Sequence, residues 1–176
     1  MIKSPEELKR YIRDIPDYPV KGVIFRDLTP LFASSEAFQY TIDSLYLMVK
    51  GLRIDKVAAI EARGFIVGAP LAKMLGVGFV PIRKAGKLPW RKKSVTYELE
   101  YGRETIEAHE DAIKHGESVL IVDDLLATGG TTLAAIDLIG QLGGKIAGLA
   151  YIVVLNYLNG RERLKGHRIF NLVDYY

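Results

Sequence analysis

The spacing of hydrophobic positions changes near Lys56. After this residue, continuous apolar runs alternate with helical segments that end at glycine, and the runs cover residues 57–60, 77–82, 119–122 and 146–155. Continuous apolar runs are typical of strands that are covered on both faces. Their alternation with helices is typical of a parallel sheet. The pattern therefore predicts an α/β fold with a mainly parallel sheet flanked by helices.

The first 50 residues contain two predicted helices. Ser4-Pro5-Glu6-Glu7 places a capping serine before a proline at the first helical position, and an apolar face follows, which predicts a short amphipathic helix. Ser34 or Ser35 begins a second helix, in which residues 38–49 keep the spacing of a buried stripe. The stretch between them, residues 16–30, shows no regular pattern.

A basic stretch, residues 83–93, interrupts the alternation. It contains glycine and proline and few apolar residues, so we expect an exposed loop. Beyond it, residues 95–101 alternate between apolar and polar side chains, and residues 105–108 can pair back with them. This pattern predicts a β-hairpin beneath a mobile loop.

Composition limits the class of protein. The 176 residues are 49% hydrophobic and 26% charged, which suits one globular domain, and the absence of cysteine excludes disulfides and thiolate metal sites. No apolar run approaches the ~20 residues of a membrane-spanning helix. We therefore expect a single domain, residues 1–176, located in the cytoplasm and without a membrane partner.

The formal net charge of +3 is unevenly distributed. Residues 83–93 hold six lysines and arginines and no acid, so the rest of the chain carries 18 basic and 21 acidic residues. A concentrated cationic segment favours attraction of a small polyanion into a cleft, whereas nucleic-acid binding needs basic residues along an extended face. We expect no nucleic-acid partner.

Residues 118–132 carry the clearest chemical signal. An apolar strand ends in Asp123-Asp124, and a turn of small residues, 127–131, precedes a helical segment. Small residues permit close approach of the backbone, and the first turn of a helix offers free N–H groups and a positive dipole end to an anion. The carboxylates can accept hydrogen bonds from a vicinal diol. A phosphate cradle beside diol acceptors predicts a site for ribose 5-phosphate.

Two other interpretations of this segment are open. A glycine-rich turn after a strand can be a tight α/β connection whose acids merely face water. Two acids at a strand end also occur in phospho-receiver domains, where they bind magnesium. That fold needs a phospho-acceptor aspartate on a later strand, but the next apolar run ends in Leu155-Asn156. The segment is not a Walker A loop, because the glycine-lysine-serine/threonine ending is missing.

Residues 122–131 resemble the phosphoribosyl-pyrophosphate motif of type I phosphoribosyltransferases, in the form found in adenine-specific members. Three further segments match that family in order and spacing: residues 24–30, 61–65 and 99–102. The resemblance covers essentially the whole chain. It implies the type I phosphoribosyltransferase fold, with a small N-terminal hood at about residues 1–34 and a flexible β-hairpin loop at about residues 83–105.

The resemblance implies conversion of adenine and 5-phosphoribosyl 1-pyrophosphate to AMP and pyrophosphate in purine salvage. Mg²⁺ is the implied cofactor, bound mainly through the pyrophosphate and ribose of the substrate, so no protein ligand is assigned. A homodimer is also implied. Two alternatives remain open: transfer to another purine, such as xanthine or hypoxanthine, and a regulator of the same fold that senses phosphoribosyl pyrophosphate.

The resemblance assigns the phosphoribosyl-pyrophosphate site residue by residue. Asp123 and Asp124 would hold the ribose hydroxyls. The 5-phosphate would lie against Ala127, Thr128, Gly129, Gly130 and Thr131. The pyrophosphate would meet Arg63, Arg83, Lys84 and Lys87, and Tyr101 would close over the site.

The resemblance also places the purine and the catalytic groups. Adenine would lie between Phe25 and Leu155, with its edge against the backbone around Ile24 and Arg26. From its surroundings alone, Phe25 would more often be a core side chain. Glu100 would orient or donate a purine proton, and Glu100 and Arg63 are the expected catalytic residues.

Overall fold

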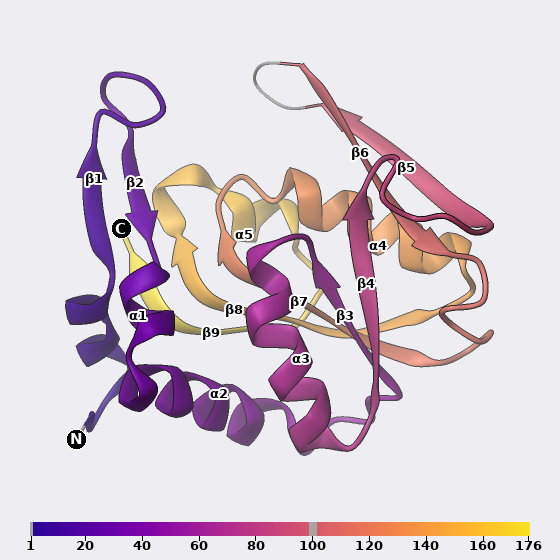
Figure 1. The fold of residues 1–176 in the computed structure, drawn as a ribbon, viewed down its shortest axis with the longest axis horizontal. Coiled ribbons are helices and arrows are strands. Elements are labelled where there is room, and N and C mark those ends of the chain that lie inside the picture. The colour runs from indigo at the N-terminus through magenta and orange to yellow at the C-terminus, as the bar shows by residue number, and fades with distance from the viewer. Residues whose placement is uncertain (1, 99–101) are drawn as a thin grey trace.

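The computed structural model describes residues 2–98 and 102–176, which contain a seven-stranded sheet (Figure 1). Five neighbouring strands are parallel: β4 (Gly78–Lys84), β3 (Lys56–Ile60), β7 (Ser118–Leu126), β8 (Lys145–Leu155) and β9 (Ile169–Tyr175). Beyond β4, the antiparallel strands β6 (Arg103–His109) and β5 (Lys92–Glu98) extend the sheet. The predicted mainly parallel α/β sheet is confirmed.

Helices cover both faces of this sheet. α2 (Ser35–Val49) and α3 (Arg63–Leu75) lie on one face, and α4 (Gly130–Gln141) lies on the other (Figure 1). Successive residues of β3 point to opposite faces, so Val57 and Ala59 join the core beneath α2 and α3, while Ala58 and Ile60 join the core beneath α4. Burial on both faces explains why the apolar runs in the sequence are continuous.

The connections that follow β3 and β7 create a crevice at the carboxyl ends of these two central strands. α3 leads from β3 to β4 on one face, whereas α4 leads from β7 to β8 on the other. Because β3 and β7 are neighbours, their two connections diverge from the same point. Open α/β sheets bind ligands at such switch points, outside the carboxyl ends of the strands.

The N-terminal region differs from its sequence-based prediction. Residues 5–11 form a 3₁₀ helix, η1 (Pro5–Tyr11), and the side chain of Ser4 makes no capping hydrogen bond, so that predicted cap is wrong. The chain leaves η1 directly into a strand, which limits the helix to short i to i+3 bonds such as Ile12 N–H to Lys9 carbonyl. The second predicted cap is confirmed, because Ser34 accepts a hydrogen bond from the Ala37 amide.

The stretch predicted to be irregular contains an antiparallel hairpin. β1 (Arg13–Pro16) pairs with β2 (Ile24–Asp27), with Ile15 opposite Phe25, and the short helix α1 (Thr29–Ala33) follows. The seven residues between the strands contain one proline and one glycine and match no two-residue turn, so sequence pattern alone gave no hairpin signal.

The remaining elements surround the carboxyl edge of the sheet. The predicted hairpin β5–β6 is confirmed, with Val95 opposite Ile106, and it stands beside this edge, across from β1–β2 (Figure 1). A 3₁₀ turn, η2 (Asn156–Leu158), and α5 (Gly160–Arg163) connect β8 to β9. In the part of the chain that the structure describes, we find no helix with the length and apolar character needed to cross a bilayer.

Substitution of two helical glycines by alanine should have opposite effects on stability. A Cβ added at Gly68 of α3 would lie 2.6 Å from the Cβ of Ala59 on β3, whereas one added at Gly140 of α4 would have no neighbour within 4 Å. We expect Gly68→Ala to lower the free energy of unfolding by about 1–3 kcal/mol through overpacking. We expect Gly140→Ala to raise it by up to about 1 kcal/mol through helix propensity. Urea denaturation measures both, and equal effects would contradict the packing of α3 on β3.

Candidate active site

A cavity of about 390 Å³ opens at the carboxyl ends of β3 and β7. Its polar lining includes Glu61, Arg63, Lys84, Tyr97, Glu104, Asp123, Asp124 and Thr131. These side chains come from the segment after β3, from β4, from the β5–β6 hairpin, from the end of β7 and from the start of α4. The topological switch point therefore gathers cations, acids and hydroxyls that are far apart in the sequence.

The predicted phosphate cradle forms a second, smaller cavity of about 80 Å³ next to the first. It is lined by Asp123 and residues 125–132, so all five predicted phosphate residues come together there. Gly129 precedes α4 with φ 81°, a left-handed conformation that glycine adopts without the steric cost of a side chain. The chain can thus turn sharply from β7 into α4 and point the first helical N–H groups into the cavity.

Two adjacent carboxylates lie near the carboxyl end of β7. The Asp124 side chain is almost fully buried, at 3% exposure, and Asp123 accepts a hydrogen bond from the Asp124 amide at 2.9 Å. Burial raises the pKa of Asp123 well above its usual value, and repulsion from Asp124 raises it further. Burial also raises the pKa of Asp124, although the Arg63 guanidinium opposes this shift.

Arg63 is held at the centre of the site by its position at the start of α3. The peptide bond between Glu61 and Ala62 is cis, and α3 begins at Arg63. The Arg63 Nε lies 2.7 Å from Asp124 Oδ2, an ion pair that lacks the angles of a hydrogen bond. The guanidinium carbon lies 5.4 Å from the centroid of the Phe25 ring, within cation–π range. Arg63 therefore links the carboxylate pair to the N-terminal hairpin.

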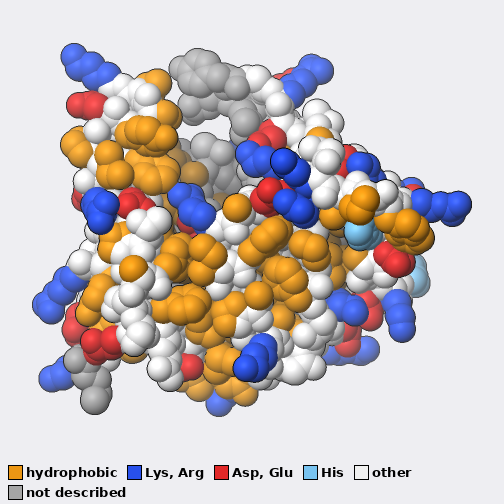
Figure 2. Space-filling view, in the orientation of Figure 1, with side chains coloured by type: hydrophobic (Ala, Val, Ile, Leu, Met, Phe, Trp, Pro, Cys, Tyr) orange, Lys and Arg blue, Asp and Glu red, His pale blue; other side chains and the backbone are white. Residues whose placement is uncertain are grey.

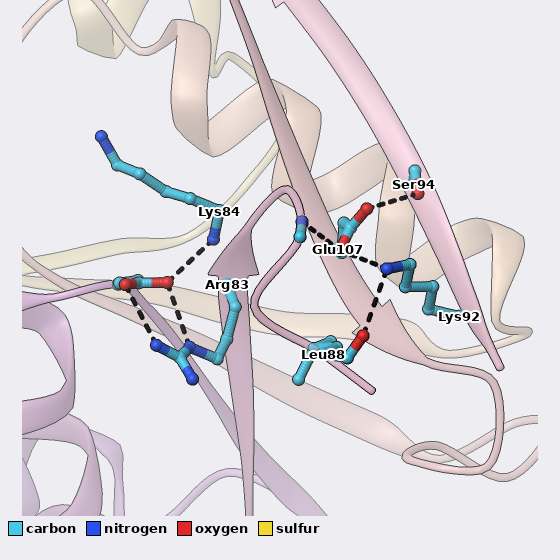
Figure 3. A network of polar contacts seen from close by, with 8 residues as sticks. Arg83, Lys84, Leu88, Lys92, Ser94 and Glu107 are labelled. Carbon is cyan, nitrogen blue, oxygen red and sulfur yellow. Dashed lines mark hydrogen bonds and ion pairs between the residues drawn. The ribbon is translucent and has the colours of Figure 1, made fainter. Parts of the chain in front are cut away.

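The first two cations of the predicted loop, Arg83 and Lys84, are instead the last residues of β4, and their side chains have different environments (Figure 3). Arg83 donates two hydrogen bonds to Glu61, at 3.1 and 3.3 Å, and this guanidinium lowers the pKa of the Glu61 carboxyl. The Lys84 amide also donates to Glu61, whereas the Lys84 side chain extends away from Arg83 and lines the larger cavity. Lys87 is exposed in the following turn. Of the predicted pyrophosphate cations, Arg63 and Lys84 thus meet at the cavity, and Arg83 and Lys87 lie outside its lining.

The base of the same loop is fixed by a buried glutamate on β6. Glu107 is 5% exposed, pairs with Lys92 at 3.1 Å and accepts a hydrogen bond from the Gly86 amide at 3.1 Å (Figure 3). Ser94 donates a longer bond, of 3.4 Å, to the same carboxylate. These contacts join both ends of the loop to the hairpin.

Two lining residues from the hairpin carry no sequence-based assignment. The Tyr97 hydroxyl lies 2.8 Å from a carboxylate oxygen of Glu104 and 3.0 Å from the hydroxyl of Thr131, and Glu104 also forms an ion pair with Lys84. Burial raises the pKa of Tyr97 to about 12, so its hydroxyl stays protonated at neutral pH. The alternating pattern placed Tyr97 on the inner face of the hairpin, but only the fold brings it to Thr131.

A third and more apolar cavity, of about 610 Å³, lies beside the N-terminal hairpin. Its lining includes the predicted residues Ile24, Arg26 and Leu155, together with Thr128, two residues that precede β2, Gly22 and Val23, and three unpredicted residues, Tyr157, Leu158 and Tyr176. The unpredicted residues follow β8 or end the chain, and no motif marked them. This cavity is therefore shared by the N-terminal hairpin, the phosphate cradle and the end of β8.

Phe25 lies between two lining residues of this cavity on β2, but it belongs neither to the lining nor to the hydrophobic core. Its side chain is half-buried, and its ring makes an edge contact with Tyr18 at 5.3 Å between centroids. The neighbouring Arg26 is fixed by an ion pair with Asp14 and by the Tyr175 ring, 4.0 Å from its guanidinium carbon. The assignments to Glu100 and Tyr101 lie outside the described residues.

Comparisons with known proteins agree with this geometry. Residues 39–171 match the family model described as phosphoribosyl transferase domain. The chain belongs to the phosphoribosyltransferase family. A curated relative from Thermotoga neapolitana, named adenine phosphoribosyltransferase, is 55% identical over 169 residues, which cover 96% of this chain and 99% of that protein.

Solved structures show the same relationship. The adenine phosphoribosyltransferase of Thermoanaerobacter pseudethanolicus superposes with a TM-score of 0.94 at 49% identity, covering 98% of this chain and 100% of that one. The Giardia lamblia enzyme in complex with 9-deazaadenine gives a TM-score of 0.93 at 38% identity, covering 99% of each chain. This phosphoribosyltransferase therefore has the type I fold, as the resemblance implied.

The buried pair of Asp123 and Asp124 should lower the stability of this phosphoribosyltransferase. We expect Asp123→Asn to stabilise the unliganded protein near neutral pH, because it removes one of two adjacent buried charges. A carboxyl whose folded-state pKa is raised costs stability above that pKa, and the cost disappears as the pH falls through it. Differential scanning calorimetry should show a midpoint about 2–4 °C higher at neutral pH, the effect of about 1 kcal/mol in a chain of this size, and a smaller gain in acid.

Asp137→Asn is the matched control for this prediction. Asp137 lies on the exposed side of α4 and bonds only at 3.3 Å to Gln141, so its substitution should leave the midpoint unchanged. An Asp123→Asn variant that is less stable than wild type at neutral pH would show that the carboxylate pair is stabilising as it stands.

Proposed function

We propose that this phosphoribosyltransferase transfers the phosphoribosyl group of 5-phosphoribosyl 1-pyrophosphate to adenine, giving AMP and pyrophosphate. The observation that carries the proposal is a row of three adjoining cavities. A site with carboxylates and cations shares Asp123 and Thr131 with the phosphate cradle, and the cradle shares Thr128 with a more apolar cavity for a base. The names of the relatives support adenine as the acceptor.

The substrate phosphates and sugar would occupy the two polar cavities. We assign the 5-phosphate to the cradle of residues 127–131, where helical N–H groups are free. The ribose hydroxyls would bond to Asp123 and Asp124, whose carboxyl oxygens line the cavity beside the cradle and can accept hydrogen bonds. The pyrophosphate would then lie in the larger of these two polar cavities, against Arg63 and Lys84.

Adenine would occupy the apolar cavity against the Leu155 side chain, and Phe25, which lies outside the lining on the bordering strand β2, would cover the other face of the ring. The backbone around Ile24 and Arg26 would bond to the ring edge, since a carbonyl can accept a hydrogen bond from the exocyclic amine. A 6-oxopurine has an oxygen there and would leave that carbonyl unpaired, which disfavours hypoxanthine and xanthine. The 9-deazaadenine complex of the Giardia lamblia relative supports an adenine-shaped site.

Charge separation is the main barrier that the protein must lower in this reaction. Departure of pyrophosphate leaves positive charge at the ribose C1 and adds negative charge to the leaving group, so fixed charges and positioning supply the catalysis. Arg63 is poised for the leaving group because its guanidinium is already fixed between Asp124 and Phe25. We assign the purine proton to Glu100 and closure over the site to Tyr101.

The residues present fit a magnesium ion that is bound mainly through the substrate. Among the described residues, no three His, Asp or Glu side chains form a metal-binding group. Glu61 and Glu104 are held by Arg83 and Lys84, so Asp123 and Asp124 would reach the ion through ribose hydroxyls and water. When bound, the ion would neutralise charge on the pyrophosphate.

We also propose a homodimer that forms through the α2 and α3 face. Apolar side chains gather over these helices in Figure 2, and large ones are exposed there: Leu47 and Met48 on α2, and Ile66 and Met74 on α3. Contiguous exposed apolar surface of this kind is typical of protein interfaces. A dimer on this face would leave the carboxyl edge of the sheet open to substrate.

The first test is formation of AMP from adenine and phosphoribosyl pyrophosphate. Adenine should be turned over in the presence of magnesium, activity should be lost with excess EDTA, and hypoxanthine and xanthine should react at least about 100-fold more slowly because a buried acceptor would be left unpaired. Product formation is followed by absorbance or chromatography. Faster turnover of a 6-oxopurine would establish the first alternative, and substrate binding without turnover of any purine would establish a regulator.

The second test concerns the base. Phe25→Leu should raise the KM for adenine about fivefold, the loss of about 1 kcal/mol of aromatic contact. It should change the KM for phosphoribosyl pyrophosphate less, because Arg63 keeps its ion pair with Asp124. Phe38→Leu is the control, because Phe38 forms an aromatic pair with Phe32 on a helix away from the three cavities. An unchanged KM for adenine would remove Phe25 from the base site.

A further inference from the structure

We propose that Arg163 is a positioning residue of the 5-phosphate site, which orients the Gly129 amide toward the phosphate and places a positive charge behind it. The inference rests on the proposed function of residues 127–131 as a 5-phosphate cradle and deepens it. Arg163 lies on α5, between β8 and β9, and no sequence motif singled it out.

The cradle has no charge of its own that could attract a phosphate. Residues 125–132 carry only uncharged side chains, and the two residues before them are acids. A phosphate monoester carries about −1.5 to −2 charge at neutral pH. Of the Lys and Arg side chains in the described part of the chain, only that of Arg163 hydrogen bonds to this segment. Its Nη1 donates to the Thr128 carbonyl at 3.0 Å. The same atom lies 3.8 Å from the place of a Cβ at Gly130.

The Thr128 carbonyl and the Gly129 N–H belong to the same peptide group. The only cis peptides of the described residues are at Pro19 and Ala62, so this group is trans, and its C=O and N–H point in opposite directions. A guanidinium that holds the carbonyl on the outer side of the turn therefore directs the amide to the inner side. Because the acceptor is bonded to a cation, the peptide is also polarised in the sense that favours an anion at the N–H.

The position of Arg163 relative to the turn is fixed by close packing of α5. A Cβ added at Gly160 would lie 2.2 Å from the Ala127 carbonyl oxygen, so the backbones are in direct contact there. Leu164 is fully buried, and its Cγ would lie 3.6 Å from a Cβ at Gly129. The residues on both sides of Arg163 thus attach α5 to the cradle.

The neighbouring basic side chains have other partners. Arg161 bonds to Asp174 at 3.0 Å and to Asn171, on β9. Lys165 is exposed and forms an ion pair with Glu162. Lys165 therefore offers a control that removes one positive charge from the same segment without touching the cradle.

The experiment measures binding of ribose 5-phosphate to the full-length protein by isothermal titration calorimetry. We expect Arg163→Met to raise the Kd about five- to tenfold, the loss of one charge-assisted hydrogen bond that supports the site. Lys165→Met should bind as wild type, and Arg163→Lys, which keeps the charge but not the planar guanidinium, should bind about threefold more weakly than wild type. In turnover, Arg163→Met should raise the KM for phosphoribosyl pyrophosphate and leave that for adenine unchanged.

Two results would overturn the inference: wild-type affinity in Arg163→Met, or equal weakening in Arg163→Met and Lys165→Met. Circular dichroism shows whether Arg163→Met is folded; if it is not, Arg163→Lys decides, and wild-type affinity in that variant overturns the inference. A wild-type protein that does not bind ribose 5-phosphate would refute the cradle and the inference together. Binding of ribose 5-phosphate without turnover of adenine would refute only the proposed acceptor.

Discussion

The divergence of α3 and α4 from two neighbouring strands is the constraint on which the site depends. β3 and β7 end side by side, but their chains leave toward opposite faces, so neither connection fills the space directly beyond the two strands. Both helices begin there, with Arg63 in the first turn of α3 and Gly130 in the first turn of α4. The free N–H groups of two helix starts therefore face one crevice, which suits a substrate with phosphates at both ends.

Two carboxylates, those of Asp123 and Asp124, are largely buried at the same crevice. Asp123 and Asp124 lie near the carboxyl end of β7, directly after four buried residues, and burial raises the pKa of both carboxyls, so their charged forms cost free energy there. Arg63 offsets part of this cost through Asp124. The binding of ribose hydroxyls, which donate hydrogen bonds, would offset more. Part of the substrate affinity would thus come from relief of a cost that is built into the fold.

The sequence predicts those parts of the fold and site that depend on local pattern. Continuous apolar runs indicated the parallel sheet, and the small residues after Asp124 indicated the cradle, because burial and close backbone approach restrict residue type at each position. Glu104 and Arg163 were missed for the opposite reason. A glutamate on a hairpin and an arginine on a short helix look like solvated charges in the sequence, and only long-range packing brings them to Lys84 and Thr128. The β1–β2 hairpin was missed because its long connection has no recognisable turn.

Packing also determines how much of the positive charge of residues 83–93 is left unpaired. In the sequence, residues 83–93 hold six cations and no acid, but three acids from neighbouring elements pair with three of them in space. These pairs join Arg83 to Glu61, Lys84 to Glu104 and Lys92 to Glu107. The paired cations shape the loop and the cavity wall, and their field at a distance is largely cancelled. Long-range attraction of a polyanion must then come mainly from the exposed Lys87, Arg91 and Lys93. Because exposed charges are screened by salt more than buried pairs are, the rate of substrate capture should depend on ionic strength through these three residues, while the geometry of the cavity does not.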